Sequence, residues 1–398
     1  MSLNNITSSE RLHISFFGCR NAGKSSLVNA LTNQQLSVVS DIKGTTTDPV
    51  KKSMELLPIG PVVITDTAGL DDGGKLGELR VAKAIEVLGK TDIAVLVIDS
   101  TVGINDYDKE IIKQFEGKNL PYIIVYNKSD INPLTQTISL KTREILVSAK
   151  TGSGVHELKE LLGKIAGENT VEKYIIGDRL HPGDIVILVI PIDESAPKGR
   201  LILPQQNVLR ECLDAHAIPI CCQVEELENI LNTFTPKPNL VITDSQVFNK
   251  IKNIVPENII LTSFSILMAN YRGELKALVN SAKIISELKD GDTVLISEAC
   301  THHRQCNDIG TVKLPKWIET NTGKNINFEF TQGGEFPSDL RKYKLIIHCG
   351  GCMINDAEMK TRQQRAKEQN VPMVNYGIAI AYMNGILGRA LEVFRVKK

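Results

Sequence analysis

Residues 12–25 of the chain read LHISFFGCRNAGKS. The first six form an apolar run of strand length, and the loop that follows, residues 18–25, leads directly into a helical pattern. A strand, a loop of this composition and a helix in this order are typical of a phosphate-binding loop. In such a loop the backbone N–H groups surround phosphate, the Lys24 side chain reaches the β- and γ-phosphates, and the Ser25 hydroxyl ligates Mg²⁺. The stretch therefore predicts a nucleotide-binding α/β domain.

Three further motifs follow strand-like runs downstream. They read DTAG at 66–69, NKSD at 127–130 and SAK at 148–150. The first offers the Asp66 carboxylate to Mg²⁺ and the Gly69 N–H to the γ-phosphate. In the second, the Asp130 carboxylate can accept from the two N–H donors of guanine, a pair that adenine lacks. The third resembles a loop whose backbone N–H contacts the guanine carbonyl. The motifs together predict that GTP or GDP is the nucleotide.

The usual catalytic glutamine is missing, because Leu70 stands where Ras-like proteins carry it. The switch region resembles that of TrmE-type GTPases, which hydrolyse GTP through a potassium-activated dimer of GTPase domains. That resemblance implies that Asn21 binds K⁺ and that Glu78 positions the attacking water. On the residues alone, Asn21 could instead cap the loop, and Glu78 could be a solvated helix residue.

The predicted nucleotide site gathers the loop, the downstream motifs and one switch residue. By resemblance, the run GTTTD at 44–48 supplies Thr46 to Mg²⁺. The residues predicted to bind nucleotide are Gly18, Asn21, Ala22, Gly23, Lys24, Ser25, Ser26, Asp66, Gly69, Asn127, Lys128, Asp130, Ser148, Ala149 and Lys150. The predicted catalytic residues are Lys24, Glu78 and Thr46, and the predicted Mg²⁺ ligands are Ser25, Thr46 and Asp66.

Length and composition indicate several ordinary folded domains. The chain has 398 residues, with 46 basic and 46 acidic side chains, so no net charge attracts it to nucleic acid or an anionic membrane. Residues 1–11 are polar and unlike a signal peptide, and no apolar run is long enough to cross a bilayer. We therefore expect a cytoplasmic protein whose eight cysteines are metal ligands or buried thiols rather than disulfides.

The rhythm of strand and helix patterns predicts three consecutive α/β domains. The first, residues 1–168, should be a doubly wound, mostly parallel sheet. The second, residues 169–256, is a small α/β domain without a recognisable catalytic cluster. The third, residues 257–398, should begin with a strand at 259–262 and carry strands at 293–297 and 344–347.

Three cysteines of the third domain follow two of these strands. Cys300 comes just after residues 293–297, and Cys349 and Cys352 come just after residues 344–347. Open α/β sheets bind ligands outside the carboxyl ends of their strands. If the two strands are parallel neighbours, the three thiols converge on one crevice.

Spacing alone leaves the metal open. A zinc site could use Cys300, His302, Cys349 and Cys352. An iron–sulfur cube on the three cysteines would leave its fourth iron to His302, His348 or an exchangeable ligand.

A Cys-x-His and a distant His-Cys-x-x-Cys behind a GTPase resemble, over the full length, the HydF family of [FeFe]-hydrogenase maturation GTPases. The resemblance implies GTPase, dimerisation and cluster-binding domains, with a [4Fe-4S] cluster on Cys300, Cys349 and Cys352 and a possible fourth ligand in His302 or His348. It implies a scaffold that receives a diiron precursor and delivers it to the apo-hydrogenase. The implied partners are a second copy of the chain, the radical-SAM maturases HydE and HydG, and that hydrogenase.

Two other functions stay open. One is a potassium-activated GTPase of RNA modification or ribosome assembly with a structural zinc, although no Lys- and Arg-rich block with interleaved aromatics supports it. The other is a redox sensor in which a cluster gates GTP hydrolysis. The fourth cluster ligand, the choice between dimer and tetramer, and the coupling of GTP hydrolysis to partner exchange do not follow from the sequence.

Overall fold

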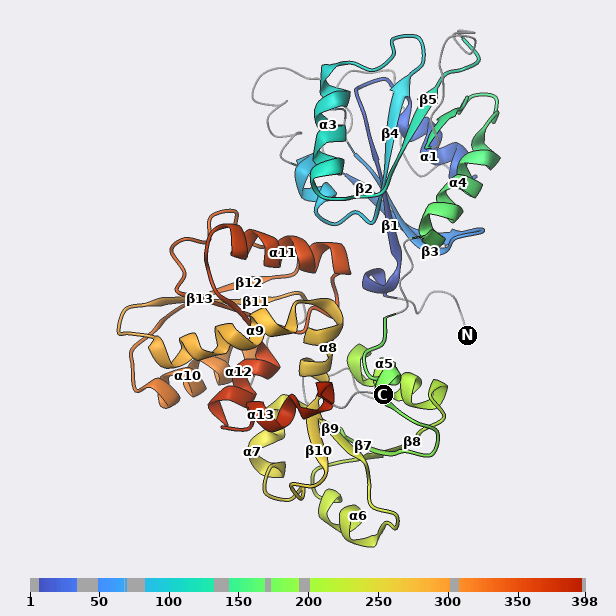
Figure 1. Ribbon diagram of the computed structural model, residues 1–398. Coiled ribbons are helices and arrows are strands. Elements are labelled where there is room, and N and C mark those ends of the chain that lie inside the picture. Colours follow the sequence, from blue (N-terminus) through green and yellow to red (C-terminus); the bar gives the residue numbers. More distant parts are fainter. Residues whose placement is uncertain are drawn as a thin grey trace. The chain divides into compact units, whose positions relative to one another are not determined.

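The computed structural model describes residues 7–33, 49–67, 69, 83–131, 143–168, 173–192, 201–300 and 308–395. Two compact units divide the chain, Met1–Val171 and Glu172–Lys398. One sheet lies in the first unit and two lie in the second (Figure 1). The α/β class with mostly parallel sheets is confirmed, while the limits of the three predicted domains stay a prediction. Within the described part, no helix has the length and apolarity needed to span a bilayer.

The first unit is built on a six-stranded sheet. In spatial order its strands are β2 (Val50–Leu56), β3 (Gly60–Asp66), β1 (Leu12–Phe17), β4 (Ile93–Asp99), β5 (Tyr122–Asn127) and β6 (Glu144–Leu146). Only β2 runs antiparallel to its neighbour. The central β4 is apolar and almost wholly buried, as expected of a parallel strand covered on both faces, whereas the edge strand β2 is mostly exposed.

Side-chain alternation along β1 explains how both faces of this sheet are covered. Ile14 and Phe16 pack with helices α1 (Lys24–Thr32) and α4 (Val155–Glu168). Phe17 points to the other face, where its ring lies 5.4 Å from that of Phe115 in α3 (Asp106–Gly117). The sheet is therefore doubly wound, as predicted.

The second unit contains two four-stranded parallel sheets. The first has the order β10 (Ile260–Ser263), β9 (Leu240–Thr243), β7 (Ile185–Val189) and β8 (Ile218–Cys222). It is accompanied by α5 (Leu203–Asp214), α6 (Leu227–Thr233) and α7 (Phe248–Ile251). The strand expected at 259–262 is present as β10, but it pairs with β9 rather than opening the third sheet. That assignment was wrong because a short apolar run does not specify its neighbour.

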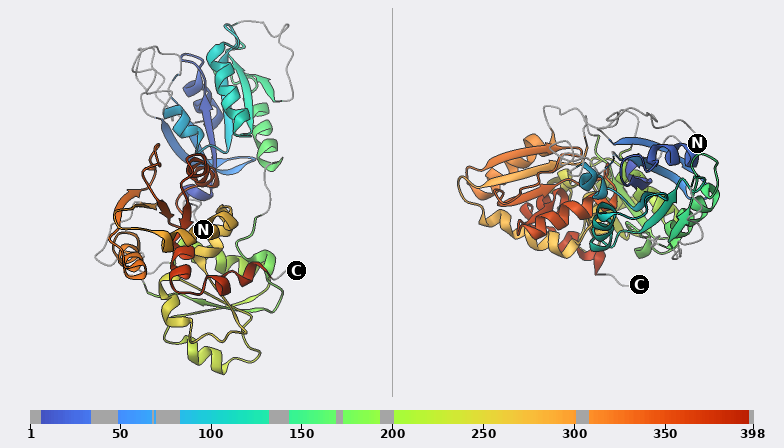
Figure 2. Two further views of the ribbon diagram at one scale, coloured as in Figure 1. Left: turned by 60° about the vertical axis from the view of Figure 1, so that its left-hand side comes forward. Right: turned by 90° about the horizontal axis from the view of Figure 1, so that it is seen from above.

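The last sheet has the order β12 (Asn327–Gln332), β11 (Thr293–Glu298), β13 (Leu345–His348) and β14 (Met373–Asn375). The helices that follow β10 in the chain are α8 (Phe264–Arg272), α9 (Leu275–Ser281), α10 (Leu314–Thr322), α11 (Asp356–Glu368), α12 (Tyr376–Met383) and α13 (Leu387–Ala390). Of these, α13 contacts β10 of the first sheet, and α8 contacts both β10 and β14. Figure 2 shows both sheets of this unit from two further directions. The edge strand β12 was not expected, because its side chains are largely exposed and carry little apolar signal.

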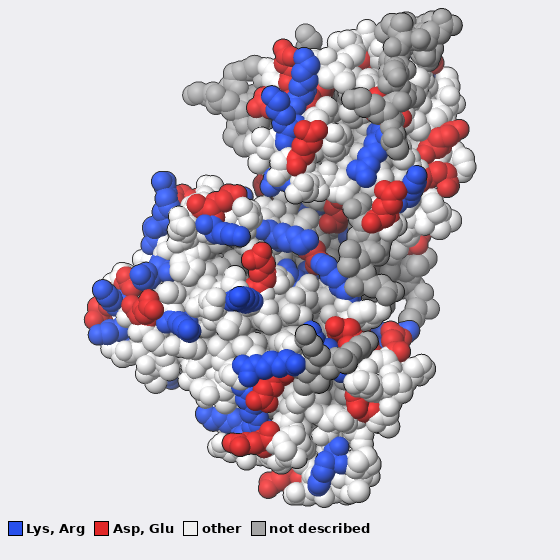
Figure 3. Space-filling model, viewed as in Figure 1, with Lys and Arg blue, Asp and Glu red and all other residues white. Residues whose placement is uncertain are grey.

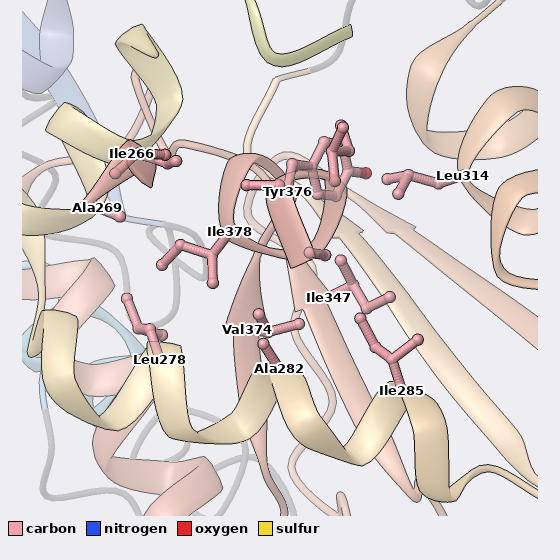
Figure 4. Packing of buried hydrophobic residues seen from close by; sticks show 14 of the residues in the cluster. Ile266, Ala269, Leu278, Ala282, Ile285, Leu314, Ile347, Val374, Tyr376 and Ile378 are labelled. Atoms are coloured by element: carbon pink, nitrogen blue, oxygen red, sulfur yellow. The ribbon is translucent and has the colours of Figure 1, made fainter. Parts of the chain in front are cut away.

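One hydrophobic core joins the two sheets of the second unit. It includes Ile187 and Val241 of the first sheet and Leu295 and Ile347 of the second. Helix α12 is apolar on all sides and buried along most of its length, as a helix enclosed by other elements must be. Figure 4 shows its residue Ile378 among labelled side chains of the neighbouring helices and strands. This shared core explains why the two sheets form one compact unit.

Candidate nucleotide site and cysteine loop

The phosphate-binding loop is closed around the Lys24 ammonium group. Lys24 Nζ donates to the carbonyl oxygens of Gly18, at 3.0 Å, and Cys19, at 2.8 Å. Gly18 has a φ of +139°, and a Cβ there would lie 2.2 Å from the carbonyl oxygen of Val97. The sequence folds this way because only glycine fits between β1 and β4 at that turn. A nucleotide phosphate would take the place of the loop carbonyls as partner of Lys24.

A Mg²⁺ ion fits the side chains beside this loop. Ser25 Oγ donates to Asp66 Oδ2 at 2.6 Å. The other oxygen, Asp66 Oδ1, is buried and has no hydrogen-bond partner among the described residues. A buried carboxylate oxygen without a partner is costly, and a hydrated Mg²⁺ would satisfy it. Gly69 of the same motif lies against the backbone of Arg20 in the loop.

Asn127 ties three motifs together at the base-binding end. Its Nδ2 donates to the Ala22 carbonyl oxygen at 3.0 Å, and its Oδ1 accepts from the Ala149 N–H at 3.0 Å. Ser148 Oγ donates to Asp130 Oδ1 at 2.7 Å, which holds the carboxylate in place. The predicted guanine contacts therefore lie together in one site.

The structure describes some of the remaining predicted residues of this unit, and others lie outside its described part. Lys128 forms an ion pair with Asp99, in which Nζ lies 2.6 Å from Oδ2. Asn21 is exposed at the tip of the phosphate-binding loop with a φ of +58°, Ser26 is half-buried and Lys150 is exposed. The catalytic candidates Thr46 and Glu78 lie outside the described residues.

The cysteine loop of the second unit has the strand arrangement on which its prediction depended. β11 and β13 are parallel neighbours, with Ser297 opposite His348 at their carboxyl ends. The Cys349 N–H donates to the Ser297 carbonyl oxygen at 3.0 Å. Cys349 Sγ in turn accepts from the N–H groups of Ala299, at 3.1 Å, and Gly351, at 3.4 Å. Hydrogen bonds of this kind stabilise a thiolate.

The three thiols are close enough to influence one another electrostatically. Burial, with a smaller contribution from the charge of Cys352, raises the pKa of Cys349 to about 11. Burial also raises the pKa of Cys300, and both Cys349 and Cys352 contribute to that rise. Without a bound cation the thiols are therefore protonated, and a cationic iron centre would compensate their charge.

The three thiols suit zinc as well as an iron–sulfur cluster, since soft sulfur ligands select both. Within the described part of the chain, no group of three or more His, Cys, Asp or Glu side chains is arranged to hold one metal ion. A cube would bind thiolates at separate iron corners. His302, and Cys306 beyond it, lie outside the described residues, so no geometry is assigned to them.

His348 is buried beside this loop with both ring nitrogens engaged. Its Nδ1 donates to the Cys349 carbonyl oxygen at 2.8 Å, and Arg362 Nη1 donates to its Nε2 at 3.0 Å. Burial and the Arg362 charge lower the pKa of His348 to about 3, so the ring is neutral. In this arrangement no nitrogen is left for iron, and the described contacts give no support to His348 as the fourth ligand.

Two arginines near the cysteines were not predicted from the sequence to belong to this site. Arg362 also donates to Glu358 and to the Gly333 carbonyl oxygen, and these bonds hold its guanidinium group in place beside His348. Arg272 donates to carbonyl oxygens of the loop that carries Cys352. Neither arginine belongs to a motif, and no spacing pattern could have identified them.

Family models match three successive parts of the chain. Residues 13–128 match the 50S ribosome-binding GTPase family. Residues 175–273 match the hydrogen maturase F dimerization domain, and residues 276–393 match the hydrogen maturase F tetramerization domain.

Curated relatives resemble the GTPase part. A tRNA modification GTPase MnmE from Endomicrobium trichonymphae is 38% identical over 164 residues, which is 39% of this chain and 36% of the relative. Its counterpart from Prochlorococcus marinus (strain MIT 9303) is 32% identical over 172 residues, covering 42% and 37%. The chain spans little more than a third of the length of these relatives.

Solved structures resemble parts of the chain more weakly. Era in complex with MgGDPNP and nucleotides of 16S ribosomal RNA is 23% identical, with a TM-score of 0.36, and the match covers 58% of this chain and 90% of Era. The bacterial selenocysteine-specific elongation factor EF-Sec is 19% identical, with a TM-score of 0.34, over 42% of this chain and 30% of that protein.

Proposed function

Because the chain belongs to the hydrogen maturase F (HydF) family, we propose that it is a GTP-hydrolysing scaffold that carries a [4Fe-4S] cluster and delivers a diiron precursor to the apo-[FeFe]-hydrogenase. The observation that carries the proposal is the parallel pairing of β11 with β13, which places Cys349 and Cys352 beside the start of the Cys300 segment. Cys300, Cys349 and Cys352 would hold the cluster.

The nucleotide side chains support GTP hydrolysis in the first unit. Lys24 would bind the β- and γ-phosphates, Ser25 and Asp66 would hold Mg²⁺ together with Thr46, and the Asp130 carboxylate would select guanine. Glu78 would position the attacking water. Lys24 and Asp66 are buried at the end of the sheet, and the arriving phosphate would replace the loop carbonyl oxygens of Gly18 and Cys19 as the partner of Lys24.

The cysteine loop supports a carrier role in the second unit. A cluster held by three thiolates would supply an iron site with an exchangeable ligand, at which the diiron precursor could be received. The protein's part is to hold the thiolates: the Ala299 and Gly351 N–H groups donate to Cys349 Sγ, and the engaged ring of His348 fixes the start of the loop. GTP turnover would bias the exchange of HydE, HydG and the hydrogenase through the switch segments.

The described part of one face of the molecule carries basic and acidic side chains together (Figure 3). Lys and Arg side chains are interspersed with Asp and Glu on the face shown in Figure 3, and no basic stripe crosses its described part. A protein that binds RNA through its phosphates needs a concentrated basic surface.

Anaerobic purification tests the proposal. We expect a brown protein that contains iron and sulfide, gives the electron paramagnetic resonance (EPR) signal of a reduced [4Fe-4S] cluster, and activates apo-hydrogenase when supplied with the two maturases. A colourless zinc protein, or an iron protein that activates no hydrogenase in that assay, would contradict it.

The GTPase reaction is expected to depend on potassium. A cation held by Asn21 at the phosphates would stabilise the charge that develops during hydrolysis, so turnover in KCl should exceed turnover in NaCl by at least about tenfold. Asn21→Ala should remove the difference, as steady-state phosphate release will show. Asn33→Ala is a matched control, because Asn33 is also exposed and has a φ of +51°. Equal rates of GTP hydrolysis by the native protein in KCl and NaCl would contradict this prediction and indicate that Asn21 only caps the loop.

A homodimer is expected to form at the open edge of the first sheet in the second unit. Among the described strands, the edge strand β8 has one unpaired side, and its residue Ile218 is 51% exposed. Edge strands with exposed apolar side chains pair readily with another copy. Ile218→Asp should weaken the dimer at least about tenfold, since a charge would be buried without a partner. Sedimentation velocity measures this, and Ile104→Asp in the first unit, where Ile104 is 40% exposed, should leave the dimer intact.

A further inference from the structure

Arg272 connects two parts of the second unit at the cysteine loop. It is the last residue of α8, which begins directly after β10, and it lies within the dimerization-domain match. Its side chain is buried, with 5% exposed, and Nη1 donates to the carbonyl oxygens of Gly351, at 3.0 Å, and Ile354. One guanidinium group therefore fixes the backbone on both sides of Cys352.

The guanidinium charge lies beside Cys352, because the carbonyl oxygens of Gly351 and Ile354 that it contacts flank that residue. A small pocket is lined by Arg272 together with Cys349 and Gly350. Arg272 and Cys349 therefore line the same pocket, and the buried charge is little screened by water.

One donor of Arg272 is unused. Nε is buried and has no hydrogen-bond partner among the described residues. An unsatisfied buried donor costs about 1–3 kcal/mol. Arg362 and Arg389 share this feature, and what distinguishes Arg272 is its place beside Cys352.

We propose that Arg272 is a positioning residue that fixes the Cys349–Cys352 loop and supplies a positive charge that raises the reduction potential of the bound cluster. The inference rests on the proposed function. A nearby positive charge stabilises the reduced cluster, which carries one more electron, so removing the charge must move the potential to more negative values.

Two substitutions separate charge from hydrogen bonding. Arg272→Lys keeps a charged donor, whereas Arg272→Gln keeps an N–H donor without the charge. Arg389→Gln is the matched control, because Arg389 also has a buried Nε without a partner and donates to backbone carbonyl oxygens, those of Val255 and Pro256. Each full-length protein is reconstituted anaerobically with iron and sulfide, its iron per chain is measured, and the midpoint potential is obtained by EPR-monitored titration.

We expect native iron content in all three variants, a native potential in Arg272→Lys and Arg389→Gln, and a more negative potential in Arg272→Gln. Loss of iron from Arg272→Gln alone would contradict this expectation, because a lost loop contact would produce it without any role of the charge. A native potential in Arg272→Gln would overturn the inference, and so would failure of both Arg272 variants to load while Arg389→Gln loads. If the native protein itself forms no cluster, the proposed function fails, and that result is distinct from the others.

Discussion

Replacing Asp130 by asparagine is expected to lower the affinity for GTP by roughly 10²–10⁴-fold and to create affinity for xanthosine triphosphate. In the proposed site the carboxylate would accept both N–H donors of guanine, and hydrogen bonds to a charged group contribute about 1.5–3 kcal/mol each. An amide offers one acceptor and turns an N–H toward the second guanine donor. Xanthine carries a carbonyl oxygen where guanine has its amine, so the amide N–H finds an acceptor there.

Isothermal titration with GTP, ATP and xanthosine triphosphate measures this change. Ser148→Ala is the control, because it removes the hydroxyl that donates to Asp130 Oδ1 but leaves both base acceptors present. We expect this variant to lower the affinity for GTP about tenfold at most and to keep the preference for guanine. Native GTP affinity in Asp130→Asn would show that the carboxylate does not contact the base.

The nucleotide site could be predicted because each part is local. Every motif is a strand end followed by a loop of fixed composition, and the parallel order of β3, β1, β4, β5 and β6 brings those loops to one edge. The motifs do not reveal the hydrogen bonds that connect them, which Asn127 forms with Ala22 and Ala149. The antiparallel edge strand β2 was not expected, because its exposed side chains are no guide to pairing.

The cysteine loop could be predicted only conditionally. The residues after β11 and β13 were expected to meet if those strands were parallel neighbours, and the neighbour relation is confirmed by the register. Strand order depends on contacts between distant segments, which is why the pairing of β10 with β9 did not follow from the sequence. Arg272 was missed for the same reason, since its contact with Gly351 joins residues 79 positions apart.

Replacing Cys349 by serine is expected to abolish the cluster while leaving the fold intact. A serine oxygen is a hard donor that binds iron–sulfur clusters poorly, whereas a thiolate is the ligand they prefer. Loss of a partner outside the ligand shell already costs about 10–100-fold in metal affinity, so loss of a ligand should cost at least ~100-fold. The N–H groups of Ala299 and Gly351 that donate to the sulfur can donate to a hydroxyl instead, so the loop need not collapse.

Iron and sulfide content after anaerobic reconstitution, with the EPR signal of the reduced protein, measures the loss. Cys221→Ser is the control, because Cys221 is exposed on β8 and its thiol is absent from the proposed ligand set. GTP turnover should persist in both variants, because the nucleotide side chains all lie in the other compact unit. Hydrogenase activation should be lost in Cys349→Ser alone, which would separate GTP hydrolysis from cluster carriage. An undiminished cluster signal in Cys349→Ser would remove this cysteine from the ligand set and leave the parallel pairing of β11 and β13 without its proposed purpose.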